Sequence, residues 1–347
     1  MRHTSEIAKN YRPPTNSRLE QILQPVSSDI ENLESQIISD LTTDIPLLNN
    51  VNEHIIGSGG KRLRPTLVLL GAEMFTGVNE KVIQAAKLIE YLHTATLLHD
   101  DVVDGAETRR ARQAVCRIWG NEASILSGDY LFAMAFYQLT KMRNTEVLRV
   151  MSDTTTRMAR GELSQLTSSF GESDEEYFEI IINKTACLFA TAIKIGALLA
   201  GGALDSADQL YEYGMALGIA FQIVDDALDY TDEYKTGKPV GGDLQERKIT
   251  LPLSQLLEKA NKSDRRRLDK ILTNHVIEKP QIEEVVNMMK NYGSIQYTLD
   301  CSRKYAFEAK RSLEKFPESS LRQTLFKLSL IHISEPTRRY AIAYAVV

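Results

Sequence analysis

The stretch LLHDDVVDGAETRR, residues 97–110, ends an apolar run with three aspartates, Asp100, Asp101 and Asp104. Residues four apart lie on one face of a helix, roughly 5–6 Å from each other, so the first and last of these carboxylates share a stripe. Carboxylates are costly in apolar surroundings unless they are paired or bind a metal. Because hard oxygen ligands suit Mg²⁺, the stretch predicts a helix that ends in a magnesium site.

The same spacing recurs in FQIVDDALDY, residues 221–230, as Asp225, Asp226 and Asp229. A single cluster of this kind is more often a solvated helix face or a helix N-terminus. Two copies, each after an apolar helical segment, favour metal binding over that interpretation. Two such stripes that face each other would hold several Mg²⁺ ions, and a diphosphate is the natural guest of that arrangement.

Composition narrows the class of protein. The 347 residues are 43% hydrophobic and 25% charged, and no Pro/Gly/Ser-rich linker divides them, which favours one large domain. The net charge of -5 argues against non-specific nucleic-acid binding. Cys116, Cys187 and Cys301 form no CxxC pair, as expected in a reducing cytoplasm. We expect no membrane span, because no apolar stretch approaches the ~20 residues that one needs, and the N-terminus lacks the apolar core of a signal peptide.

Apolar residues recur at helical spacing through most of the chain, and β-branched alternation is almost absent, so we predict an all-α fold. Residues 1–18 form an expected flexible arm before a domain that spans 19–328. Glycine-rich loops are expected at 57–64 and 231–248. The expected helices cover 18–48, 81–104, 127–142, 146–169, 175–199, 206–230, 252–259 and 262–313.

Basic groups lie near both acid clusters in the sequence. The segment GGKRLRP, residues 59–65, holds three cations in a tight loop whose glycines let the backbone approach an anion. Arg109 and Arg110 follow the first cluster, and an arginine fork matches phosphate oxygens. Each of these could instead be an ordinary surface cation. Together they supply the positive charge that a diphosphate needs beyond its metal ions.

Further candidates come from other parts of the chain. His93 shares the stripe of the first cluster and is either a core histidine or a phosphate donor. Gln222 lies one turn before Asp225 and either orients the site or caps a buried carboxylate. The remaining candidates are Lys184, Thr185, Lys238 and Lys248.

These motifs, in this order, resemble the trans-isoprenyl diphosphate synthases of the polyprenyl synthetase family, from about residue 18 to 328. The resemblance is carried by GGKRLRP, LLHDDVVD with its following RR, the KT pair, FQIVDDALD and the GGD…K loop. It implies an isoprenoid-synthase bundle of long antiparallel helices around a deep central cavity, in a homodimer. It also implies Mg²⁺-dependent condensation of isopentenyl diphosphate onto an allylic diphosphate primer.

The resemblance implies a role for each matched residue. The six aspartates would bind Mg²⁺, and Lys184 and Lys238 would assist catalysis. Isopentenyl diphosphate would be held by Lys61, Arg64, His93 and Arg110. The allylic diphosphate would be held by Arg109, Lys184, Thr185, Gln222, Lys238 and Lys248. The run RRARQAV departs from the family's RRGKPT, which puts the local loop conformation in question.

Product length depends, in this family, on the residues four and five positions before the first aspartate. Here these are Thr96 and Ala95, both small, as in bacterial octaprenyl diphosphate synthase, so we expect a long all-trans product that supplies quinone side chains. Helix packing alone could also account for small residues there. Phe132 and Phe136 are candidates for the floor of the cavity.

Other functions fit the sequence less well. A shorter-chain farnesyl or geranylgeranyl synthase remains the alternative product class. A non-catalytic subunit of a heteromeric synthase would be expected to lose aspartates or the arginine pair, and both are present. A terpene cyclase would lack the second cluster and the GGKRLRP loop, and a helical scaffold would not need acid stripes inside apolar helices.

For the C-terminal run from Leu328 to Arg339 we expect a foreign origin, with a divergent natural tail as the alternative. The letters LSLIHISEPTR of this run match the translation of a common transposon sequencing adapter, and Pro336 would interrupt a helix. We therefore expect residues 329–347 to be foreign to the natural protein and to pack poorly against the domain. We assign no function to them, including His332 and the Arg338–Arg339 pair.

Overall fold

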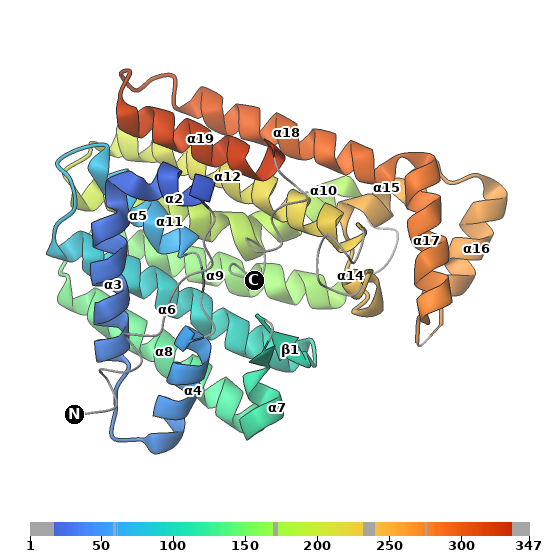
Figure 1. Ribbon diagram of the computed structural model, residues 1–347, viewed down its shortest axis with the longest axis horizontal. Coiled ribbons are helices and arrows are strands. Elements are labelled where there is room, and N and C mark those ends of the chain that lie inside the picture. Colours follow the sequence, from blue (N-terminus) through green and yellow to red (C-terminus); the bar gives the residue numbers. More distant parts are fainter. Residues whose placement is uncertain are drawn as a thin grey trace.

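The chain folds as a bundle of helices, most of which run along the longest axis of the molecule (Figure 1). A computed structural model describes residues 17–57, 60, 62–110, 112–168, 173–231, 240–274 and 276–334. The N-terminal elements are α2 (Ser17–Leu23), a 3₁₀ turn (Gln24–Val26), α3 (Ser27–Asp40), α4 (Pro46–Gly57), α5 (Leu63–Glu73), α6 (Glu80–Val103), β1 (Thr108–Arg109), β2 (Arg112–Gln113) and α7 (Val115–Trp119).

The remaining elements are helical. They are α8 (Asn121–Lys141), α9 (Thr145–Thr167), α10 (Asp174–Ile181), a π-helical turn (Ile182–Ala186), α11 (Cys187–Leu199), α12 (Leu204–Asp229), α14 (Gly242–Gln245), α15 (Leu251–Lys259), α16 (Lys262–Leu272), α17 (Lys279–Tyr292), α18 (Ser294–Ser312) and α19 (Ser320–Ser334). The predicted all-α fold is confirmed. The strands within the described residues form a single two-residue antiparallel hairpin, in which Arg109 pairs with Arg112.

The main core lies where α5, α6, α11 and α12 meet. Glycines let α5 and α11 pack backbone to backbone. A Cβ at Gly71 would lie 2.2 Å from the Ile193 carbonyl oxygen, and one at Gly196 would lie 1.9 Å from that of Val68. This close contact fixes α11, and with it the π turn that precedes it, against the helix that follows the GGKRLRP loop.

One expectation about membranes has to be corrected. The continuous helix Asp174–Leu199 has 26 residues and a mean hydropathy of 1.4, so it is long and apolar enough to cross a membrane by composition alone. The structure packs it in the centre of the bundle, with 72% of its most apolar window buried. The helix was predicted at nearly this length, as 175–199, but its apolar character was not recognised because Asn183 and Lys184 interrupt the apolar run.

The other helix predictions hold with shifted ends. Helix α8 begins at Asn121, six residues before the predicted Ser127. The predicted helix over 262–313 is divided into α16, α17 and α18. Gly293 ends α17 with a φ of 70°, a left-handed conformation that glycine adopts without steric cost.

The C-terminal run does not pack as predicted. Helix α19 continues through Leu328 to Ser334, and Ser329 and Ile331 are each only 1% exposed. Ile331 belongs to the main core. Ser329 and Ile331 occupy helical positions that face the bundle, so the expected poor packing is wrong for these two residues. Residues 335–347, with Pro336, lie outside the described residues, and the foreign origin of the run stays a prediction.

Candidate active site

The two acid clusters lie at the C-terminal ends of two core helices. Asp100 and Asp101 are in the last turn of α6, and Asp104 caps it. The second cluster occupies the last turn of α12. A helix C-terminus carries partial negative charge, so carboxylates there are unfavourable without compensating cations. The alternative interpretation, that these clusters lie at helix N-termini, is therefore excluded.

Cations from other segments compensate the first cluster. The Nε of Arg109, in β1, donates to Asp101 Oδ1 at 2.7 Å. The Nζ of Lys248, which follows α14, donates to Asp104 Oδ2 at 2.8 Å. Arg110, at the turn of the hairpin, has a φ of 51°. The departure from the family loop pattern thus leaves a tight turn in which Arg109 still reaches the cluster.

Neutral donors hold Asp226 of the second cluster. Asp226 is buried, and its carboxylate accepts from Tyr177 Oη at 2.6 Å and from Gln222 Nε2 at 2.8 Å. The Oε1 of Gln222 in turn accepts from Thr185 Oγ1 at 3.0 Å. Gln222 therefore donates to a buried carboxylate of the cluster, which is the second of the two roles considered for it.

A short chain of contacts joins the two clusters. The backbone N–H of Asp243 donates to Asp229 Oδ2 at 3.0 Å, and the carbonyl of Asp243 accepts from the backbone N–H of Lys248 at 2.8 Å. The Lys248 side chain then reaches Asp104 in the first cluster. The ends of α6 and α12, which are far apart in the sequence, thus line one site.

Because the carboxylates of this site are buried, their ionised forms need positive charge nearby. Burial raises the pKa of Asp100 to about 6, although the ammonium of Lys184 opposes the shift. Burial likewise raises the pKa of Asp226 and of Asp243 well above the usual range, and neighbouring carboxylates add to both shifts. A bound cation would reverse these shifts by stabilising the ionised forms.

Lys184 and Thr185 lie in the π turn, which faces both clusters. Lys184 Nζ contacts Glu162 Oε2 at 2.6 Å and Gln165 Oε1 at 2.5 Å, both on α9. Thr185 contacts the second cluster through Gln222. Single-turn π-helices are rare and occur frequently at functional sites.

A separate basic group lies beside the first cluster. Arg64 Nη1 and His93 Nε2 are 3.0 Å apart and both residues are buried. Burial lowers the pKa of Arg64 to about 10; Glu90 opposes this, and the like charge of Arg110 adds to it. The structure thus brings Arg64, His93 and Arg110 together, as the sequence predicted. Positive groups that lie together in this way can bind an anion.

The carboxylates fit Mg²⁺ that is shared with a ligand. Within the described residues, no three acidic, histidine or cysteine side chains converge closely enough to hold a metal ion alone. Mg²⁺ is usually bound by one or two carboxylates, with waters and substrate phosphates completing its octahedron. Hard oxygen donors at two facing helix ends match that pattern, and a bound cation would oppose the rise that burial causes in the pKa of Asp100.

The predicted chain-length residues lie between α6 and α8. Ala95 is fully buried, and its carbonyl oxygen would be 3.1 Å from a Cβ at Gly128. Thr96 is half-buried and donates to the His93 carbonyl at 2.8 Å. Phe132 and Phe136 stack with ring centroids 5.3 Å apart. Their role in product length stays a prediction.

Some site residues were not predicted from the sequence, and some predicted ones lie outside the described part of the chain. Lys61 and Lys238 fall outside the described residues. Glu162, Gln165 and Tyr177 were not predicted, because each belongs to a helix that reads as ordinary core packing in the sequence. Asp243 belongs to the GGD motif quoted above, so the sequence contained a signal that could have identified it as a site residue.

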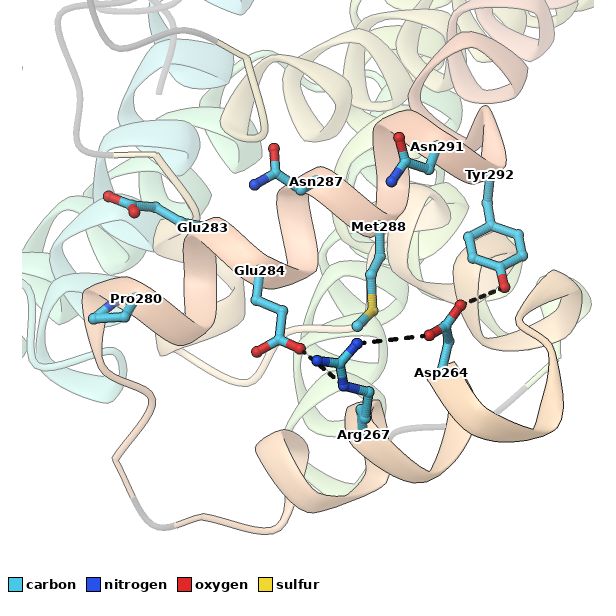
Figure 2. A pocket seen from close by; sticks show the side chains of 9 residues that line it. All are labelled: Asp264, Arg267, Pro280, Glu283, Glu284, Asn287, Met288, Asn291 and Tyr292. Carbon is cyan, nitrogen blue, oxygen red and sulfur yellow. Dashed lines mark hydrogen bonds and ion pairs between the residues drawn. The ribbon is translucent and has the colours of Figure 1, made fainter.

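A hollow of about 630 Å³ lies elsewhere, between α16 and α17. Figure 2 shows its lining, in which Arg267 lies between Glu284 and Asp264, and Tyr292 donates to Asp264. Neither acid cluster contributes to this lining. We therefore place the chemistry at the ends of α6 and α12.

Comparison with known proteins agrees with this site. The family model described as polyprenyl synthetase matches residues 45–289. The octaprenyl diphosphate synthase of Haemophilus influenzae is 34% identical, over 91% of this chain and 96% of the relative. A short chain isoprenyl diphosphate synthase of Methanothermobacter thermautotrophicus is 36% identical, over 88% and 94%.

A solved structure shows the same fold. A polyprenyl synthase from Caulobacter crescentus CB15, complexed with calcium and isoprenyl diphosphate, has a TM-score of 0.86 at 32% identity, over 96% of this chain and 99% of that one. A family site that takes a divalent metal with a diphosphate agrees with two facing acid clusters. The chain belongs to the polyprenyl synthetase family and is a prenyl-transferring enzyme.

Proposed function

We propose that this enzyme condenses isopentenyl diphosphate onto an allylic diphosphate at the ends of α6 and α12, with Mg²⁺, and builds a long all-trans polyprenyl diphosphate. The observation that carries the proposal is the chain of contacts from Asp229 through Asp243 and Lys248 to Asp104, since it makes both acid clusters part of one site. Several Mg²⁺ ions there would supply Lewis acidity that stabilises the departing diphosphate.

The protein's own cations would share the charge of the allylic diphosphate. Lys184 lies close enough to Asp100 to oppose the rise in its pKa. Arg109 and Lys248 contact the first cluster directly. With Thr185, Gln222 and Lys238, they would hold the diphosphate as the allylic carbon–oxygen bond breaks. Fixed charges aimed at developing negative charge are a large source of rate enhancement.

The basic group of Arg64, His93 and Arg110 would hold isopentenyl diphosphate, together with Lys61. Within the described part of the chain, Arg64 Nε is buried and has no hydrogen-bond partner. A phosphate oxygen at that atom would satisfy it and would balance the two arginine charges. The group lies next to the first cluster, since the charge of Arg110 opposes the rise that burial causes in the pKa of Asp101, so the two substrates would meet there.

Product length would follow from the space beyond the first cluster. Ala95 and Thr96 are small where a ring would block a growing chain, which supports a long product, octaprenyl-like, for a quinone side chain. The alternative is a shorter product, and the Methanothermobacter relative is named as a short chain synthase. With either product length, the enzyme would work in the cytoplasm on soluble diphosphates.

The enzyme would act as a homodimer through α8. This helix exposes large apolar side chains at helical spacing, with Leu126 at 66%, Tyr130 at 36% and Tyr137 at 61% exposure. An exposed apolar stripe of this kind marks an interaction surface, and a second copy of the same helix would cover it. Sedimentation of the purified chain and of Tyr137→Glu tests this: a dimer that becomes a monomer supports it, and a monomeric natural chain contradicts it.

The test of function uses the purified chain alone. It is incubated with radiolabelled isopentenyl diphosphate and farnesyl diphosphate, with Mg²⁺ or with EDTA, and the dephosphorylated products are sized by chromatography. We expect Mg²⁺-dependent products of about forty carbons. Products of twenty carbons or fewer would establish the shorter-chain alternative. Absence of any condensation would contradict the proposed function and favour a subunit that needs a partner.

A further inference from the structure

The π turn Ile182–Ala186 interrupts a continuous helix at the residues that face the site. Its wider winding breaks the regular hydrogen-bond ladder, so such a turn depends on support from neighbouring elements. Here Lys184 and Thr185, which are adjacent in sequence, have different partners. Lys184 pairs with Glu162 and donates to Gln165 on α9, and Thr185 contacts Asp226 of the second cluster through Gln222. The geometry of this one turn therefore sets both contacts.

One face of α9 supports the turn. Gly161 brings α9 so close that a Cβ there would lie 2.5 Å from the backbone nitrogen of Lys184. Gln165, four residues later on the same face, contacts the Lys184 side chain at 2.5 Å. Arg157, four residues earlier, donates from Nε to Asn183 Oδ1 at 3.0 Å.

Arg157 also ties the turn to a third helix. Its Nη1 donates to Tyr211 Oη, on α12, at 2.6 Å. Asn183 is fixed at a second point, because its carbonyl accepts from Cys187 Sγ at 2.8 Å. One planar guanidinium thus joins α9, the π turn and the helix that carries the second acid cluster. Arginine forms such two-direction contacts with less loss of freedom than lysine.

We propose that Arg157 is a positioning residue that holds the π turn and so aims Lys184 and Thr185 at the two acid clusters. It touches neither substrate nor metal in this assignment and acts only through Asn183 and Tyr211. The proposal rests on the proposed function, because it assumes that Lys184 faces the allylic diphosphate. It predicts that loss of Arg157 slows turnover and leaves binding at the Arg64 group unchanged.

The experiment compares Arg157→Met, which keeps the length of the side chain, with Arg157→Lys and with Arg160→Met as control. Arg160 is an exposed arginine on the same helix. In Arg157→Met, kcat should fall about 10- to 100-fold, because small misplacements of catalytic groups have effects of that size. Lysine should restore part of the loss. The KM for isopentenyl diphosphate should stay within about twofold of the control.

A second readout does not depend on activity. Hydrogen–deuterium exchange of the amides over residues 182–187 should accelerate in Arg157→Met and stay unchanged in Arg160→Met. If Arg157→Met does not fold, Asn183→Ala removes the same contact from the other side and should give the same slow kcat and fast exchange.

The outcomes separate the two proposals. A natural chain that does not condense diphosphates contradicts the proposed function, whereas the exchange data still decide whether Arg157 holds the turn. An active natural chain, with Arg157→Met equal to Arg160→Met in kcat and in exchange, overturns the positioning role. Combining Arg157→Met with Asn183→Ala should add no further loss to that of Arg157→Met, since Arg157→Met already removes the contact with Asn183.

Discussion

The two acid clusters have the same spacing but are held in different ways. In the first, arginine and lysine side chains from other segments contact Asp101 and Asp104. In the second, a tyrosine, a glutamine amide and a backbone N–H contact Asp226 and Asp229. Burial raises the pKa of Asp101, but Arg109 opposes that shift, whereas the pKa of Asp226 lies well above its usual range.

This difference indicates that the two clusters depend on bound cations to different degrees. Part of the charge of the first cluster is balanced by the protein, so it can stay ionised before ligands arrive. Asp226 depends more on bound cations to ionise fully, because its neutral donors compensate a carboxylate less than a charge does. Metal affinity should therefore be more sensitive to changes around Asp226 than to changes around Asp101.

The largest effect is expected when either cluster loses a carboxylate. Asp100→Ala and Asp225→Ala should each lower kcat by at least about 100-fold, since a lost contact to developing charge has effects of that size. The exposed Asp300→Ala, on α18, is the control and should leave kcat unchanged. Steady-state assays with thermal melts to confirm folding measure this. Near-normal turnover in either cluster variant would contradict the diphosphate site.

A smaller effect is expected when the support of one cluster is removed. Tyr177→Phe deletes the hydroxyl that donates to Asp226 and keeps the buried ring. Partners behind metal ligands typically contribute about 10- to 100-fold to metal affinity or activity, so the Mg²⁺ concentration for half-maximal rate should rise within that range. Tyr292→Phe, which deletes a hydroxyl that donates to Asp264 away from both clusters, is the matched control. An unchanged Mg²⁺ requirement would show that the two clusters do not differ as described.

Product length should change when α6 is altered just before the first cluster. Ala95→Tyr places a ring in the expected path of the growing chain and should shorten the product by several isoprene units while condensation continues. Because Ala95 is fully buried, overpacking should also lower stability by about 1–3 kcal/mol. Thr96→Phe, at a half-buried position, avoids much of that strain. Long products from both variants would show that this face of α6 does not line the path.

The smallest effect concerns pH. The pKa of Asp100 is raised to about 6, so in the metal-free enzyme its contribution to stability is present below pH 4 and is lost as pH rises through 6. Mg²⁺ must displace this proton at low pH, which weakens binding about fourfold at pH 5.5 relative to pH 7.5. The increase in Tm on adding Mg²⁺ should thus be larger at pH 7.5. An equal increase at both values would contradict the raised pKa.

The sequence predicted the long helices and the acid clusters because both depend on local spacing. It did not predict Tyr177 or Arg157, whose partners are Asp226 and Asn183, because a hydrogen bond between distant helices leaves no local pattern. The division at Gly293 was missed because a single left-handed residue does not disturb the apolar period. The packing of Ile331 was missed because apolar residues can continue a helix whatever their origin, including residues encoded by an adapter.

The apolar helix Asp174–Leu199 has a consequence for biosynthesis. As it leaves the ribosome, before α12 is made, its composition resembles that of a membrane anchor. Lys184 lies near its middle, where a lysine costs roughly 2.5–3.5 kcal/mol on insertion into a bilayer. The cation that faces the acid clusters in the folded enzyme therefore also opposes capture of the nascent chain by a membrane, until the later helices bury its apolar faces.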